Sequence, residues 1–236
     1  MIGIAILAIP RLFALYGVIT TSLLLFISML LHLVSNYLLR ESVDMFQAKS
    51  WVDLCEKSGG KTLKALFYGI SITKILLTNT SMVIIEARLL NFFCLATNIA
   101  DLSAHYDTLV LVLVSFIFFP ISLFQLLNAY RIKATIFFIL LFICLLIVLF
   151  SLPSYLNSPS YDTKSINWYT TDLDKILMCF SVLVMAFFYQ FNAITVYMEL
   201  RDPSAQRMDK VHLRAQGFAF ILYFLIGIAA YFSTLD

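Results

Sequence analysis

The sequence predicts an all-α membrane protein with several spans. Of its 236 residues, 61% are hydrophobic and 13% are charged, and a water-soluble domain of this size cannot bury so much apolar surface. The apolar residues gather in seven stretches, which short polar connections separate. About 20 apolar residues cross a bilayer core as a helix, and lipid requires each span to pair its own backbone groups. We therefore expect one helical membrane domain over residues 1–236.

The lengths of these stretches give the expected spans. The apolar run at 2–39 would form a helix of about 57 Å, nearly twice the thickness of a bilayer core. A break at Tyr16 and Gly17 divides this run into two spans. The seven expected spans are about 2–15, 18–39, 63–90, 108–123, 134–152, 176–197 and 211–232.

The basic residues predict the orientation of the chain. With the N-terminus in the cytoplasm, the inner connections hold eleven lysines and arginines and the outer connections hold three. The positive-inside rule therefore predicts a cytoplasmic N-terminus and an outer or lumenal C-terminus. The plasma membrane and a vacuolar or lysosomal membrane both fit this multi-pass arrangement.

Composition also restricts the partners and the chemistry. The net charge of +2 argues against nucleic acid as a partner. The four cysteines and three histidines are scattered without the paired spacing of a metal site, so we expect no metal and no cofactor. An intramembrane enzyme would need His, Cys, Asp or Glu grouped at one depth, and the sequence shows no such group.

The third expected span carries a polar face that includes a lysine. Ser71, Lys74, Thr78 and Ser81 recur at intervals of three and four residues, which places them on one side of a helix. Lys74 lies about 16 Å into the span, where an unpaired charge costs at least about 2.5 kcal/mol. We expect it to face the bundle interior or a wet cavity. It is then either an ion-coupling or cavity charge, or a packing residue bonded to carbonyls and hydroxyls.

The second span repeats this pattern more weakly, because Thr21, Ser28, His32 and Ser35 share a face. His32 fits two roles there, a hydrogen-bonded packing residue or a proton carrier.

Two segments have the composition of interrupted helices. The first is 2–10, which contains Gly3 and Pro10, and the second is 187–192, where amide and hydroxyl side chains enter an apolar run. Transporters use such interruptions because unwound backbone and half-helix ends offer polar groups to substrate and ions. Alternatively, Gly3 allows close helix packing, while Gln190 and Asn192 bond neighbouring helices.

Five blocks along the chain, two of them at the interrupted segments, resemble the amino acid/auxin permease family. The opening GIAILAIPRLF at 3–13, followed by Gly17, resembles the family's G-x-G-I-L-x-L-P-x-x-F segment. Trp51, Asp53 and Leu54, followed by two glycines, resemble its aromatic-x-acidic-Leu segment. The other matches lie at and after the fourth, sixth and seventh helices: Pro120, Ser122, Leu123 and Asn128; Ala186, Phe187, Asn192, Tyr197, Glu199, Leu200, Pro203, Ser204 and Met208; and Tyr223, Gly227 and Tyr231.

This resemblance implies a leucine-transporter-type fold, in which two five-helix inverted repeats enclose a site between broken first and sixth helices. Residues Gly3, Ile4 and Ala5 would then offer backbone to the amino acid substrate. On the opposite side, the sixth-helix break would contribute Tyr189, Gln190 and Asn192, and Lys74 would flank the same cavity. A coupling ion, Na⁺ or H⁺, is part of what the resemblance implies.

The sequence departs from the family pattern at four points. Ala5 stands where a second glycine is usual, and Gln190 stands where histidine is common, which puts coupling through that histidine in doubt. The chain starts within the first-helix break and stops after the seventh helix. We therefore expect the first repeat, with a truncated first helix, and two helices of the second. Additional helices or a further subunit would complete the site, and the chain alone is not expected to catalyse coupled uptake.

The leading hypothesis is a secondary-active permease that moves small neutral or related amino acids by alternating access and performs no covalent chemistry. Its partners would be the amino acid and the lipid bilayer. The alternative is a non-transporting relative that acts as an amino acid sensor or partner subunit, or an inactive fragment.

Overall fold

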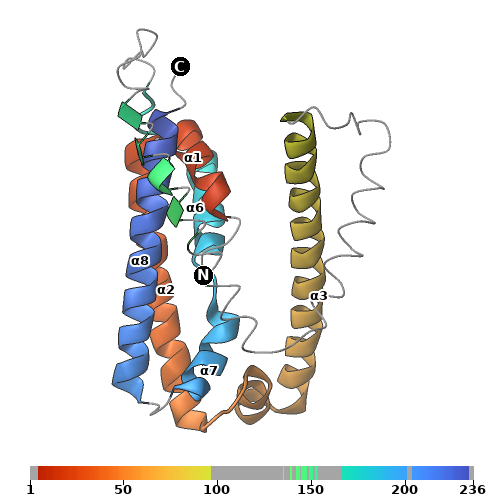
Figure 1. Cartoon of the computed structure of the whole chain (residues 1–236). Coiled ribbons are helices and arrows are strands. Elements are labelled where there is room, and N and C mark those ends of the chain that lie inside the picture. Colours follow the sequence, from red (N-terminus) through yellow and green to blue (C-terminus); the bar gives the residue numbers. More distant parts are fainter. Residues whose placement is uncertain are drawn as a thin grey trace. The chain divides into compact units, whose positions relative to one another are not determined.

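The computed structural model describes residues 5–96, separate positions between 135 and 153, and residues 166–200 and 204–233. These residues form helices and no strand (Figure 1). The helices are α1 (Ala5–Tyr16), α2 (Val18–Phe46), α3 (Trp51–Ala96), α6 (Leu173–Ala186), α7 (Gln190–Glu199) and α8 (Ala205–Phe232). The expected span 108–123 and most of the span 134–152 lie outside the described residues.

Three helical stretches are long and apolar enough to cross a membrane: Val18–Phe46, Leu173–Glu199 and Ala205–Phe232. The prediction of an all-helical chain with membrane-capable helices is therefore confirmed for the part of the chain that the structure describes.

The chain divides into two compact units. The first contains 1–58 and 138–236, and the second contains 59–137. Helix α3 begins in the first unit and continues in the second, and its backbone leaves helical geometry at Gly60, with φ 70° and ψ −164°.

The predicted break at Tyr16 and Gly17 is confirmed, since α1 ends at Tyr16 and α2 begins at Val18. Gly17 has φ 89°, and a Cβ atom there would lie 2.6 Å from the backbone nitrogen of Tyr169. Only glycine fits both conditions. The neighbouring backbone pairs two of the N–H groups that a helix start leaves open: Val18 N–H donates to Asn167 O (3.0 Å), and Ile19 N–H donates to Trp168 O (2.8 Å).

Asn167 joins this break to a third helix. Its Nδ2 donates to the carbonyl oxygens of Ala14 (3.2 Å) and Leu15 (3.4 Å) at the end of α1. Its backbone N–H donates to the Tyr231 hydroxyl of α8 at 2.9 Å. The segment around Asn167 therefore fastens α1, α2 and α8 at one end of the first unit.

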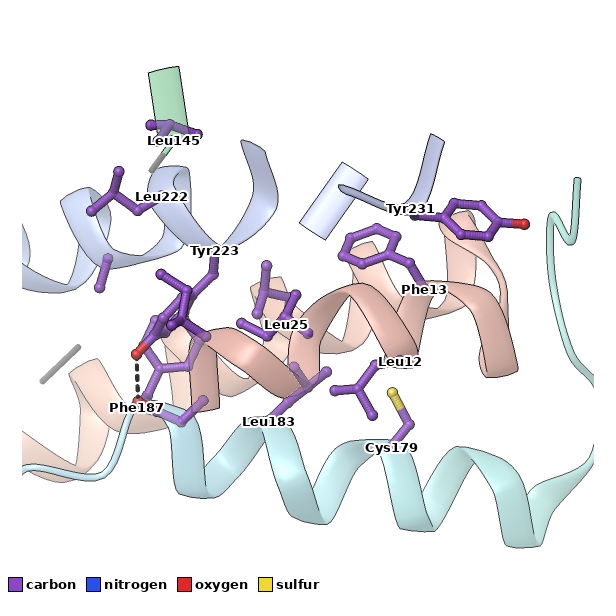
Figure 2. Close-up of a cluster of buried hydrophobic side chains, with 14 residues drawn as sticks. Leu12, Phe13, Leu25, Leu145, Cys179, Leu183, Phe187, Leu222, Tyr223 and Tyr231 are labelled. Atoms are coloured by element: carbon purple, nitrogen blue, oxygen red, sulfur yellow. Dashed lines mark hydrogen bonds between the residues drawn. The ribbon is translucent and has the colours of Figure 1, made fainter. Parts of the chain in front are cut away.

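The apolar core of the first unit lies between α1, α2, α6 and α8 (Figure 2). A Cβ atom on Gly227 of α8 would lie 2.4 Å from the Phe13 ring of α1, so this glycine permits the close approach of the two helices. The rings of Phe187 and Tyr223 meet edge to face, with centroids 5.4 Å apart. Helices in lipid associate through such close packing, because lipid is as apolar as the side chains themselves.

Two expectations about helix ends need correction. From Ala5 onward α1 is continuous through Pro10, so the predicted interruption does not reach this proline. A proline costs the helix one backbone hydrogen bond, and membrane helices tolerate this loss. The second correction is that α2 ends at Phe46 rather than Leu39, because Arg40 pairs with Asp44 in its last turns and with Asp209 of α8.

Candidate functional site

The sixth expected span is interrupted. Helix α6 ends at Ala186 and α7 begins at Gln190, and the residues between them are not helical. The interruption predicted at 187–192 is confirmed, but it covers only 187–189. Residues 190–192 are helical instead, because Asn192 N–H donates to Tyr189 O (2.9 Å) and so already closes the first turn of α7.

The structure gathers part of the predicted substrate site at this break. Tyr189 is half-buried, and its hydroxyl is hydrogen-bonded to His212 Nδ1. Gln190 begins α7 and donates from Nε2 to Ser35 Oγ (3.4 Å), while its buried Oε1 has no partner among the described residues. Asn192 is exposed on α7.

The other predicted site residues are less defined. Ala5 is the first residue of α1, which packs against α6, and Gly3 and Ile4 lie outside the described residues. Lys74 lies on α3 in the second unit and is half-buried. Because α3 is helical from Ser71 to Ser81, the predicted shared face exists. Whether Lys74 serves the break stays a prediction.

Helix α2 carries a buried polar stripe. Of the four residues predicted to share a face, Thr21, Ser28 and His32 are buried, whereas Ser35 is exposed. The stripe continues instead through Asn36 and Arg40. Sequence reasoning missed these two, although the same spacing of three and four residues reaches them from His32.

Helix α8 places a second set of buried polar residues opposite this stripe. The two helices are antiparallel, since Arg40 contacts Asp209 at one level and the Phe26 ring meets the Phe220 ring (5.9 Å) at another. His212 and Gln216 lie buried between these levels. The sequence placed His212 at the edge of the seventh span, without a role. We call the residues Ser28, His32, Asn36, Tyr189, His212 and Gln216 the polar seam.

Hydrogen bonding in the polar seam is incomplete. His32 Nδ1 lies 3.0 Å from Ser28 O, and Asn36 Nδ2 donates to His32 O (2.8 Å). Within the described part of the chain, Ser28 Oγ, Asn36 Oδ1 and both amide atoms of Gln216 are buried without a partner. Such groups are costly in an apolar environment unless water or a ligand pairs them.

A small cavity adjoins the polar seam. Its volume is about 10 Å³, and Asn36, Arg40, Tyr197 and His212 contribute to its wall. The cavity exposes apolar atoms, so a water molecule there would lack the polar partners that hold buried water.

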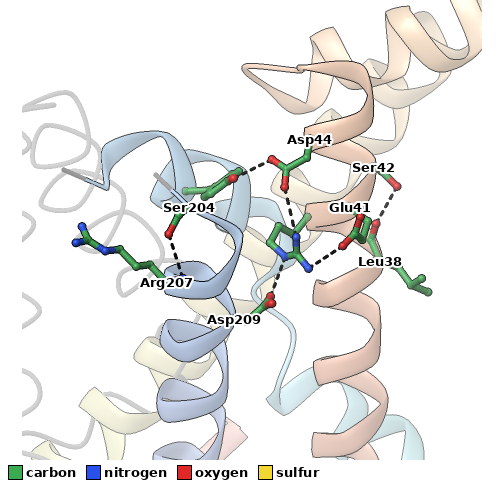
Figure 3. Close-up of polar contacts among 9 residues, drawn as sticks. Leu38, Glu41, Ser42, Asp44, Ser204, Arg207 and Asp209 are labelled. Carbon is green, nitrogen blue, oxygen red and sulfur yellow. Dashed lines mark hydrogen bonds and ion pairs between the residues drawn. The ribbon is translucent and has the colours of Figure 1, made fainter. Parts of the chain in front are cut away.

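A charge cluster closes the seam at the end of α2 (Figure 3). Arg40 is only 6% exposed and bonds three carboxylates, those of Asp209 (2.8 Å), Glu41 (2.9 Å) and Asp44 (3.3 Å). The Tyr197 hydroxyl of α7 donates to Asp44 Oδ1 at 2.8 Å. Arg40 and its partners therefore connect α2, α7 and α8.

Trp51, the first residue of α3, holds the half-helix that follows the break. Its indole Nε1 lies 3.2 Å from Gln190 O and 3.1 Å from Phe191 O, and donates to both. The ring also packs on the Phe191 ring, with centroids 5.9 Å apart. The aromatic residue of the aromatic-x-acidic-Leu segment thus acts on α7.

The acidic residue of the same segment caps α3. Asp53 N–H donates to Ser50 Oγ (3.1 Å), and Asp53 Oδ2 accepts from Lys49 N–H (2.8 Å). This backbone bond and the nearby Lys57 ammonium hold the pKa of the Asp53 carboxyl below its ordinary value. The charged form of Asp53 therefore fixes the start of α3, next to Trp51.

An apolar helical unit with a broken helix and a buried polar seam is typical of a membrane protein that handles a polar solute. The family model described as transmembrane amino acid transporter protein matches residues 1–233, and the chain belongs to this family. With three membrane-capable helices, it is an integral membrane protein, and its family implies a non-enzymatic role.

A relative in Plasmodium falciparum (isolate 3D7) bears the name "Putative amino acid transporter AAT1". It is 24% identical over 243 residues, which cover 100% of this chain and 38% of the relative. The chain therefore spans well under half of that relative's length. No solved structure matches the chain.

Proposed function

We propose that the chain forms part of a secondary-active transporter for small neutral or related amino acids, with the substrate site at the break between α6 and α7. The interruption at 187–189, inside a chain that belongs to an amino acid transporter family, carries this proposal. A break in a spanning helix frees backbone groups in the membrane, and the usual reason to keep them is a polar ligand.

The chemistry of the break suits an amino acid. The N-cap residue of α7, Tyr189, makes no side-chain cap bond, so the positive end of this half-helix can face a carboxylate. The free Oε1 of Gln190 can accept a hydrogen bond from an ammonium group. Gly3, Ile4 and Ala5 would contribute backbone from the opposite side, and Lys74 would add positive charge to the cavity.

The same proposal includes a leucine-transporter-type architecture with a cytoplasmic N-terminus. A short α1 packed against α6, with α7 separated from it by a break, is consistent with paired half-helices around a site. Single cysteines in place of Ser158 and Ser204 would test the orientation with impermeant thiol reagents. Labelling of position 204 from outside, with position 158 protected, would overturn it.

The function is tested by substrate counterflow in liposomes that contain the complete transporter of which the chain is proposed to form part, because counterflow needs no ion gradient. A mixture of labelled neutral amino acids should exchange at a saturable rate. Gln190→Ala should raise the half-saturating concentration about tenfold, the effect of losing one or two hydrogen bonds. Ser181→Ala is the matched control, because Ser181 is exposed and, among the described residues, bonds only Leu177 O of its own helix.

Absence of exchange from correctly folded protein would refute transport. Saturable binding of amino acids without exchange would favour the sensor alternative.

A further inference from the structure

We infer that His212 is a proton-binding site and that its hydrogen bond to Tyr189 couples proton uptake to the break between α6 and α7. The coupling ion of the proposed transporter is then a proton. This inference rests on the proposed function for its transport measurement, although not for the titration described below.

His212 is buried and bonded to the break. It lies on α8, only 4% exposed, and its Nδ1 is hydrogen-bonded to the hydroxyl of Tyr189, the residue that ends the break. The two rings are 5.5 Å apart. Imidazole is the side chain that gains and loses a proton most readily near neutral pH. A change of charge at His212 therefore acts directly on the N-cap residue of α7.

The direction of the hydrogen bond between His212 and Tyr189 depends on the protonation of His212. When the neutral ring carries its hydrogen on Nε2, the Tyr189 hydroxyl donates to Nδ1. A proton that binds Nδ1 turns this nitrogen into a donor, so the hydroxyl must send its own hydrogen elsewhere. The Gln216 amide lies next to the Tyr189 hydroxyl, and its buried Oε1 accepts no hydrogen bond from the described residues. Uptake of one proton thus supplies a donor to an acceptor that lacks one.

One partly exposed carboxylate lies close to His212 along the chain. Asp209, which is 40% exposed, lies one turn before His212 on α8. A titratable group that meets solvent therefore lies beside the buried ring on its own helix.

Several charged or titratable groups face His212 from the helices around it. Arg40 and Asp44 lie on α2, with His32 higher on the same helix, and Asp209 lies on α8 itself. Tyr197 of α7 shares the wall of the cavity, and Tyr189 comes from the break. Arg40 contacts three carboxylates, so these four side chains together carry a net negative charge.

The unpaired oxygens of α2 do not form a site for a metal cation. Cation sites gather several oxygen atoms around one point. The unpaired oxygens of Ser28 and Asn36 lie eight residues apart on α2, which is about 12 Å along the helix. They cannot coordinate the same ion.

His32 provides a matched comparison. It has the same exposed fraction as His212, 4%, but its Nδ1 must donate to the Ser28 carbonyl. It contacts the apolar Phe187 ring, with centroids 6.2 Å apart, and no hydroxyl of the break. We expect a proton on His32 to have little effect on α7.

The transport test uses the full polypeptide in liposomes with a pH-sensitive dye inside. Addition of a neutral amino acid mixture should carry protons inward, and one proton per substrate supports about tenfold accumulation per pH unit. In His212→Gln, the ratio of uptake with and without a pH gradient should fall to about one, whereas His32→Gln should keep the wild-type ratio. Wild-type exchange without any proton movement would overturn the inference and leave the proposed function intact. The same holds if His32→Gln alone removes the pH dependence.

The titration test does not need transport. In histidine-labelled protein in lipid nanodiscs, the NMR signal that His212→Gln removes should titrate between about pH 4 and about pH 9. Tyr189→Phe, which removes only the hydroxyl, should shift its midpoint and leave the His32 signal unchanged. A His212 signal that stays in one protonation state over this range would overturn the inference, whether or not the wild-type protein transports amino acids.

Discussion

The two ends of the first unit are built on different principles. At one end, the segment around Asn167 pairs the open backbone groups of α1 and α2, and glycines let helices and backbone touch. At the other end, the polar seam leaves buried groups unpaired, and Arg40 joins three helices through charges. A fully paired, closely packed end has one arrangement, whereas a seam with unpaired groups has several of similar energy. We therefore expect the Asn167 end to stay fixed while the Arg40 end moves.

The largest expected effect is Gly17→Ala. The alanine would have to adopt a positive φ, and its methyl group would meet the Tyr169 backbone, which cannot turn away as a side chain can. We expect a loss of about 3 kcal/mol in the free energy of unfolding or a failure to fold. Gly217→Ala is the control, since among the described residues no atom outside its own stretch of α8 lies within 4 Å of the Cβ position. Denaturation in mixed micelles measures both, and equal stability of the two variants would contradict the fixed end.

The next effect is Arg40→Met. Loss of the Arg40 guanidinium leaves the carboxylates of Asp209 and Asp44 without their cation, but both carboxylates are partly exposed and remain hydrated. The expected loss is therefore about 1–3 kcal/mol, below the value for a fully buried pair. Lys175→Met breaks an exposed contact with Asp172 and should cost under about 0.5 kcal/mol. The free energy of unfolding is measured for both variants. A smaller loss for Arg40→Met than for Lys175→Met would show that the charge cluster does not stabilise the fold.

A smaller and local effect is expected for Trp51→Phe. The ring remains, but the two carbonyl oxygens of Gln190 and Phe191 lose their indole donor, at a cost of about 1 kcal/mol. Amide hydrogen exchange should rise in α7 and stay unchanged in α6. Trp168→Phe is the control, because this side chain is exposed. Faster exchange in α6 and α7 alike would show that Trp51 supports the whole unit rather than the half-helix.

The smallest effect concerns Asp53. Its pKa is lower in the folded chain than in the unfolded one, so its contribution is present above the unfolded pKa of about 3.9. This contribution is lost as the pH falls through the folded value. Amide exchange at 50–58, followed from about pH 6 down to about pH 2 and corrected for the intrinsic rate, should rise only at the acid end. Asp53→Asn should remove this pH dependence, and an unchanged profile in that variant would contradict the capping role.

The sequence was sufficient for features that depend on local chemistry. Gly17 marks a break because its neighbours are long apolar runs, and the amide and tyrosine side chains near Gln190 mark the second break. Helix ends were predicted less well, since the extension of α2 beyond Leu39 depends on Asp209, which is distant in sequence. The same reason explains why His212 and Asn36 were missed. The role of a single polar residue in a span depends on the residues that the facing helix places opposite it, and the sequence does not show which helix that is.

The comparison of the two ends is tested most directly by distances between spin labels in the full polypeptide. One pair, at Leu23 and Leu177, reports on α2 and α6 near the Asn167 end, and the other, at Leu38 and Met198, reports on α2 and α7 near Arg40; all four side chains are exposed. On addition of a neutral amino acid mixture, the second distance distribution should shift and the first should not. A shift of the first pair, or none in the second while substrate exchange is measurable, would contradict the account.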